Sequence, residues 1–140
     1  MSESAASLFD TGMERYQAGE SPDTLIPVFQ EVCAISPKTA VAWSCLAWLY
    51  LLDDKPNKAY KAALKGTKLN QNSPQAQVNL AIAMLETGKT GVRKHIEIVK
   101  QQMTMSAELE KELSESLEDG LRRKPDWESL NRVKKWLYEV

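Results

Sequence analysis

Apolar residues recur at intervals of three and four along almost the whole chain, with polar residues between them. This spacing places the apolar side chains on one face of a helix. No stretch alternates apolar and polar residues between hairpin turns, so strands are not expected. The pattern predicts seven to eight helices, near residues 4–18, 23–36, 39–52, 56–69, 73–87, 91–103, 107–120 and 126–139.

The predicted helix boundaries carry recognisable start and stop signals. Serine followed by proline, which suits the N-cap and first position of a helix, occurs at residues 21–22 and 73–74. Further prolines at predicted starts and glycines at predicted ends are Pro56, Pro125, Gly19 and Gly88. No linker or low-complexity tract interrupts the pattern, so a single all-α domain is expected over residues 1–140.

The apolar positions also repeat at a longer interval of 34 residues. Tyr16, Tyr50 and Met84 stand one interval apart. Other positions step along with them, in the sets Phe9, Trp43 and Gln77; Met13, Ala47 and Ala81; and Phe29 and Ala63. A fixed period of this length is typical of stacked supersecondary units. Each such unit buries its apolar face only against its neighbours.

The second unit carries the most specific motif. Large residues fall on its first helix and small residues fall where two helices would cross. The spacing W-x2-L-A-x2-Y-x8-A-x3-A-x2-G is formed by Trp43, Leu46, Ala47, Tyr50, Ala59, Ala63 and Gly66. This spacing resembles that of the tetratricopeptide repeat, a helix–turn–helix unit. The resemblance implies a right-handed α-solenoid of stacked antiparallel helix hairpins.

The other units follow the same phase less closely. In the first unit Met13 replaces the usual small residue, and the matching positions are Phe9, Tyr16, Leu25, Phe29, Val32 and Pro37. In the third unit Val92, Ile96 and Val99 come one residue early, which predicts a turn shortened by one residue after Gly88. Units are therefore expected at about 6–39, 40–73, 74–106 and 107–140. The last is degenerate or capping, with Leu113, Ser114, Leu117, Leu130 and Val133 at its matching positions.

In such a stack the first helix of each unit lines a concave groove that can hold a peptide or a helix. The resemblance assigns to this groove the residues Asp10, Glu14, Gln17, Ser44, Trp48, Leu51, Leu52, Val78, Asn79, Ile82, Leu85 and Glu86. The partner-binding residues expected from this set are Asp10, Glu14, Trp48, Leu51, Leu52, Val78, Asn79, Ile82 and Leu85. The groove would be acidic at its first end and apolar in its centre.

Some tetratricopeptide proteins hold the terminal carboxylate of a chaperone tail with lysine, asparagine and arginine side chains. This chain departs from that pattern. Asp10 and Glu14 stand where the first unit would need lysine and asparagine, and Ser44 and Gln75 offer no cation. Asn79 alone does not make such a site, so binding of acidic tails is not expected.

The helix expected at 39–52 is apolar on nearly all sides, because Trp48, Leu51 and Leu52 are not needed for the repeat contacts. A helix of this kind has both faces covered. Three covers are open: an apolar segment of a partner anchored on Trp48, the chain's own helices including the last one, or a second copy in a homodimer.

The segment at 126–139 is an amphipathic helix with basic residues around its apolar face, which is formed by Trp127, Leu130, Val133, Trp136 and Leu137. A solenoid needs a helix that covers its last apolar face. We expect this capping role, with Trp136 partly exposed; docking on a membrane surface is the alternative. A second basic stripe, Lys58, Lys61, Lys65 and Lys68, is expected on a solvated convex face.

Composition adds little beyond a soluble helical domain. The formal net charge is −1, which gives no general reason to bind nucleic acid or a membrane, although residues 1–37 and 106–119 are each strongly acidic. Cys33, Cys45 and His95 lack the spacing of a metal site, so free thiols in a reducing cytoplasm are expected. No nucleophile motif, phosphate loop or secretion signal occurs, and no enzyme, metal or cofactor is expected.

The sequence therefore favours a cytoplasmic protein–protein interaction module or adaptor that binds a partner helix or peptide in its concave groove, as a chaperone-like or assembly factor would. The alternative is a self-associating structural protein that dimerises through the apolar groove or the C-terminal helix. The identity of the partner lies beyond the pattern.

Overall fold

The computed structural model describes residues 3–139, which form eight helices and no strands within that range. The helices are α1 (Glu3–Gln17), α2 (Pro22–Ile35), α3 (Ala40–Leu52), α4 (Pro56–Leu69), α5 (Pro74–Glu86), α6 (Val92–Met105), α7 (Ala107–Arg123) and α8 (Glu128–Leu137). The all-α prediction is confirmed. The ends of the predicted domain, residues 1–2 and Val140, lie outside the described residues.

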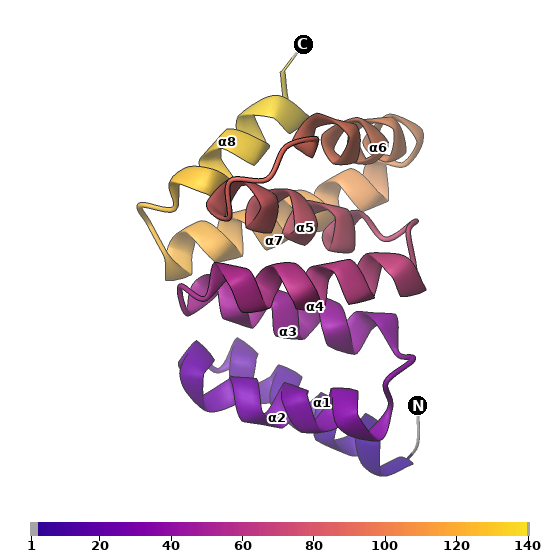
Figure 1. Ribbon diagram of the computed structural model, residues 1–140, viewed down its shortest axis with the longest axis vertical. Helices are drawn as coiled ribbons and strands as arrows, with labels where there is room; N and C mark the ends of the chain where they lie inside the picture. Colours follow the sequence, from indigo (N-terminus) through magenta and orange to yellow (C-terminus); the bar gives the residue numbers. More distant parts are fainter. Residues whose placement is uncertain (1–2, 140) are drawn as a thin grey trace.

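The first six helices form three hairpins stacked in chain order (Figure 1). Within the stack α2 packs on α1, α3 packs on α2 and α4, and α5 packs on α4 and α6. Each helix therefore covers the apolar face of the one before it, as expected for repeated units that share one continuous core.

The hairpin turns of the second and third units use the same backbone device. Asp54 and Gly88, one period apart, both adopt a left-handed conformation, with φ of 57° and 71°. The residue after each donates a backbone hydrogen bond five residues back, from Lys55 to Tyr50 and from Lys89 to Met84. This closure resembles the left-handed ending that commonly stops helices.

The predicted one-residue slip in the third unit is present, but the connection itself is not shorter. Val92, the first buried residue of α6, follows Gly88 by one residue fewer than Ala59 follows Asp54. The non-helical stretch nevertheless grows, from residues 53–55 to residues 87–91, because α6 begins late, after a second left-handed residue, Gly91.

Small residues let the helices of the first two units cross closely. A methyl group added to Gly66 would meet the Ser44 hydroxyl at 3.0 Å, which confirms the tight crossing predicted for the second unit. In the first unit the small residue is Gly12, where an added methyl group would meet the Phe29 ring at 2.8 Å. Met13 therefore does not occupy the crossing.

The last two helices do not repeat the hairpins before them. α8 packs on α5 and α6 and covers the end of the stack with its apolar face, as predicted for a capping helix. Trp127, Leu130, Val133 and Leu137 are buried there. α7 takes another course: its C-terminal half reaches back to α1 of the first hairpin and α3 of the second.

Candidate functional site

Helix α3 is apolar on nearly all sides, and most of its side chains are buried within the chain. Trp48, Leu51 and Leu52, which the repeat contacts do not explain, have exposed fractions of 8%, 0% and 9%. Over Trp48 the cover is formed by α7 and by Trp127, the residue before α8. Of the three covers left open by the sequence, the chain's own helices are the one present in the structure.

Trp48 is covered from two sides. The ring of Trp127 lies against it with a centroid distance of 5.2 Å. From the other side the backbone of α7 approaches at Gly120, where an added methyl group would meet the Trp48 ring at 2.8 Å. Only a glycine fits this approach without displacing the ring.

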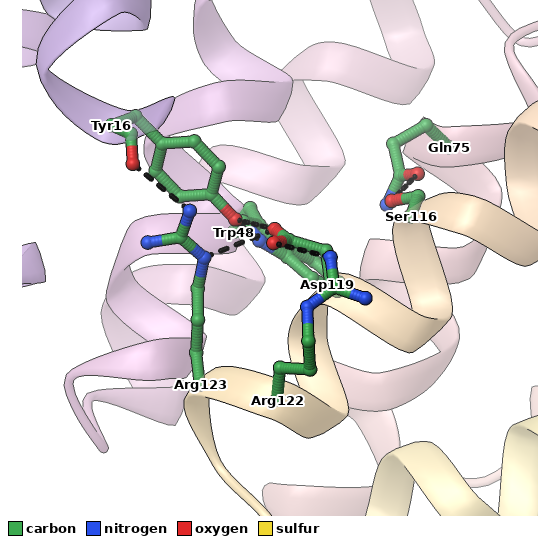
Figure 2. Close-up of polar contacts among 7 residues, drawn as sticks. All are labelled: Tyr16, Trp48, Gln75, Ser116, Asp119, Arg122 and Arg123. Carbon is green, nitrogen blue, oxygen red and sulfur yellow. Dashed lines mark hydrogen bonds and ion pairs between the residues drawn. The ribbon is translucent and has the colours of Figure 1, made fainter. Parts of the chain in front are cut away.

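A polar cluster fixes the C-terminal half of α7 to the first two units (Figure 2). The indole nitrogen of Trp48 donates to the Tyr16 hydroxyl at 2.8 Å, and this hydroxyl donates to Asp119 at 2.5 Å. Arg123 bonds both Asp119 and the carbonyl of Tyr16, and its guanidinium stacks 3.7 Å from the centre of the Tyr16 ring. Arg122 adds a weaker ion pair to Asp119.

The electrostatics of this cluster keep each group in the state that the hydrogen bonds require. Burial, reinforced by the hydrogen bond to Asp119, raises the pKa of Tyr16 far above its usual value, so the phenol stays protonated and donates. Burial also tends to raise the pKa of Asp119, but the bonds from Tyr16 and Arg123 outweigh it and hold the pKa below 3.8. Asp119 is therefore ionised at neutral pH.

Further hydrogen bonds continue the contact along the concave face. Lys124 donates to the carbonyl of Leu51, and Trp127 donates to Glu86. Towards the start of α7, Ser116 donates to Gln75 (Figure 2), whose amide donates to Asn79. Asn79 in turn donates to the carbonyl of Ser44.

The predicted partner-binding residues range from fully buried to exposed in the structure. Leu51, Val78, Asn79 and Ile82 have no exposed surface, so they are not available to a partner in this conformation. Trp48 and Leu52 are nearly covered, and Leu85 is half-buried. The exposed members are Asp10 and Glu14. At Trp48, in the apolar centre of the predicted groove, the cover comes from Gly120 of α7 and from Trp127.

One part of the concave face stays open beside α7. A pocket of about 430 Å³ lies between α1, α3 and α7, and its lining residues include Met13, Tyr16, Val41, Cys45, Trp48, Ser116 and Asp119. Val41 at its wall is 51% exposed, which is unusual for a large aliphatic side chain. The pocket is thus mostly apolar, within the size range of about 300–1,000 Å³ that is usual for ligand sites.

A second pocket, of about 530 Å³, adjoins the first. Ser73 and Gln75 belong to the walls of both. The rest of the second pocket's wall is formed by Pro74 and by the start of α7, including Glu108 and Glu112. The two pockets lie side by side along α7, and below they are together called the groove. The first is mostly apolar, and the second is bordered by these two glutamates.

The cysteines and the histidine singled out in the sequence do not form a site with one another. Both thiols are free, as predicted, and burial raises the pKa of each to about 12. Cys45 lies against the sulfur of Met13 in the pocket wall. His95 is hydrogen-bonded to Gln77 at 2.6 Å, and burial followed by the charge of Lys94 lowers its pKa.

The two basic stretches lie where they were expected. Lys58, Lys61, Lys65 and Lys68 are all exposed on α4. Trp136 is half-buried on α8, stacked near Arg93 and Arg132. Among the described residues, no helix is long and apolar enough to cross a membrane.

Comparison with known proteins identifies the class by fold. No family model and no curated protein matches the sequence. Solved structures do match. The Yersinia enterocolitica type III secretion translocator chaperone SycD has a TM-score of 0.70 and 18% identity over 96% of this chain and 94% of its own. PcrH from Pseudomonas aeruginosa has a TM-score of 0.65 and 19% identity over 98% and 92%.

A third similar structure is the first tetratricopeptide domain of Spaghetti (RPAP3), bound to an HSP90 peptide, with a TM-score of 0.60 and 18% identity over 97% and 92%. At these identities the likeness establishes architecture. The chain is a small helical solenoid of the tetratricopeptide type. This confirms the fold that the 34-residue period predicted.

Proposed function

We propose that this chain is a protein-interaction module that binds a segment of a partner protein in the open pocket between α1, α3 and α7. The observation that supports it is the apolar lining of this pocket, in which Val41 is exposed and Met13 and Cys45 are partly exposed. Exposed apolar surface of this kind is typical of interaction sites. The role that fits best is an adaptor or assembly factor.

The fold supports the same proposal. The similar structures include a translocator chaperone and a domain solved with a bound peptide. Of the residues expected to bind a partner, Trp48 lines the pocket, and Asp10 and Glu14 lie on exposed positions of α1. Asp10 precedes Met13 by three residues, so the two share a face of the helix. The proposed site therefore keeps the acidic end of the predicted groove.

Site-specific photo-cross-linking in the native host tests the proposal. A benzophenone amino acid replaces Val41 in the pocket wall, and the matched control carries it at Lys61, which is exposed on α4. We expect products with another protein from position 41 that position 61 does not give. Identical product patterns from both positions would contradict the pocket as a site. A product between two copies of purified chain would favour the homodimer instead.

A further inference from the structure

The groove beside α7 has acidic side chains along one wall. Glu108, Glu112, Ser116 and Asp119 follow one another at intervals of four, four and three residues, so they share one face of α7. The two glutamates line the second pocket, and Ser116 and Asp119 line the first. This face borders both pockets.

The negative charge of this wall is only partly compensated inside the chain. Asp119 is paired with Arg122 and Arg123. Glu108 and Glu112 are exposed and form no ion pair with any residue in the described part of the chain. Because like charges one helical turn apart repel each other, a cation bound between them would relieve this repulsion.

Helix α1, which contributes to the first pocket, carries acidic residues outside the pocket wall. α1, which supplies Met13 and Tyr16 to the first pocket, also exposes Asp10 and Glu14. Residues 1–37 and 106–119 each hold six acidic residues and one basic residue. The lysine stripe of the chain lies elsewhere, on α4, and lines neither pocket. The acidic residues that line the two pockets are Glu108, Glu112 and Asp119, all on α7.

From this charge pattern, and on the basis of the proposed function, we propose that the groove binds an amphipathic partner segment that combines apolar side chains with lysine or arginine. The apolar side chains occupy the pocket around Met13, Val41 and Trp48. The cationic side chains pair with Glu108 and Glu112. Complementary charge of this kind selects among partners and speeds association, more than it adds raw affinity.

A displayed library of random 12-residue peptides, selected on the full chain, tests this inference. A parallel selection uses Val41→Trp, which places a large uncharged side chain at the pocket wall. We expect the wild type to enrich peptides that carry apolar residues together with a net positive charge, and we expect Val41→Trp to lose them. Circular dichroism of both proteins shows that the variant keeps its helices.

The most enriched peptide then serves as the probe for the charges. Glu108→Gln combined with Glu112→Gln should weaken its binding by about two- to tenfold, as expected for two exposed charge pairs. The matched control, Glu97→Gln with Glu118→Gln, removes the same charge from exposed residues that line neither pocket and should leave the affinity unchanged. Raising the salt concentration should weaken binding to the wild type more than to the double variant.

The outcomes separate the two proposals. Peptides that depend on Val41 but are neutral or acidic would overturn the inference about charge and leave the proposed function standing. An equal loss of affinity in both glutamine pairs would also overturn the inference. A selection that yields no peptide dependent on Val41 would contradict the proposed function together with the inference.

Discussion

At the scale of single residues, Gly120 holds the position with the least room. It lies inside α7, where glycine costs about 1 kcal/mol relative to alanine. Its presence there is explained by contact, since Trp48 and Leu130 both lie within 3 Å of the place where a methyl group would stand. Helix propensity and packing therefore make opposite demands at this residue.

Gly120→Ala tests which demand is larger. Overpacking a filled site typically costs about 1–3 kcal/mol, which exceeds the gain in helix propensity. We expect a net decrease of about 1 kcal/mol in the free energy of unfolding, measured by urea denaturation. Gly66→Ala, where the nearest atom is the Ser44 hydroxyl at 3.0 Å, is the milder comparison. A Gly120→Ala variant more stable than the wild type would show that α7 does not pack closely on Trp48.

Asp119 makes the free energy of unfolding depend on pH, with lower stability in acid. Its pKa is lower in the folded chain than its usual 3.8, so it stabilises the fold fully above about pH 5. This contribution is lost as the pH falls through the folded pKa. Asp119→Asn should lower the free energy of unfolding by about 1.5–3 kcal/mol at pH 7.

The difference between wild type and Asp119→Asn should shrink when denaturation is repeated at pH 3. Asp126→Asn, at an exposed carboxyl in the connection before α8, is the control and should have little effect at either pH. A difference between wild type and Asp119→Asn that does not change with pH would show that the carboxylate charge does not hold the cluster.

At the scale of the elements, α8 and the residues that lead into it serve as a cover. Trp127 is 2% exposed, contacts Trp48 and donates to Glu86. Trp136, on the other side of α8, is half-buried between arginine side chains. Trp127 thus links α3 to α5 in the core, whereas Trp136 lies on the partly exposed side of α8.

Replacing each tryptophan with alanine separates these roles. Trp127→Ala should lower the free energy of unfolding by about 3–5 kcal/mol, as for other large core residues. Trp136→Ala should cost distinctly less, because its surroundings are partly solvated. Thermal melting of both variants measures the order. If Trp136→Ala were the more damaging change, α8 would not be packed as described.

The elements themselves were predictable because they depend on local pattern. The 34-residue period identified the three hairpins, and the one-residue slip at Val92 was visible in the sequence. The period could not show where α7 goes, since a fourth hairpin and a helix laid back on the concave face bury the same Leu113 and Leu117. The one local sign is Gly120, at which the predicted helix 107–120 ends, whereas α7 continues to Arg123.

At the scale of the whole molecule, the concave face is largely an internal interface. The sequence pattern predicts that Trp48, Leu51 and Leu52 of α3 are covered, as they are in the structure. Sequence pattern alone does not distinguish an internal cover from a partner. The polar groups that identify the cover, Tyr16 and Asp119, stand 103 residues apart and are brought together only by the stack. Substituting Trp48 would therefore destabilise the fold, so a loss of binding in such a variant would not identify Trp48 as a binding residue.

The most direct test of the account is hydrogen–deuterium exchange of the full chain with and without the peptide or partner that binds at Val41. We predict slower exchange around Met13, at the start of α3 and along residues 106–119, with α7 at least as protected as before. Binding beside α7 requires this result. Faster exchange throughout α7 on binding would contradict the account, because it would mean that the partner displaces α7 and occupies the covered groove.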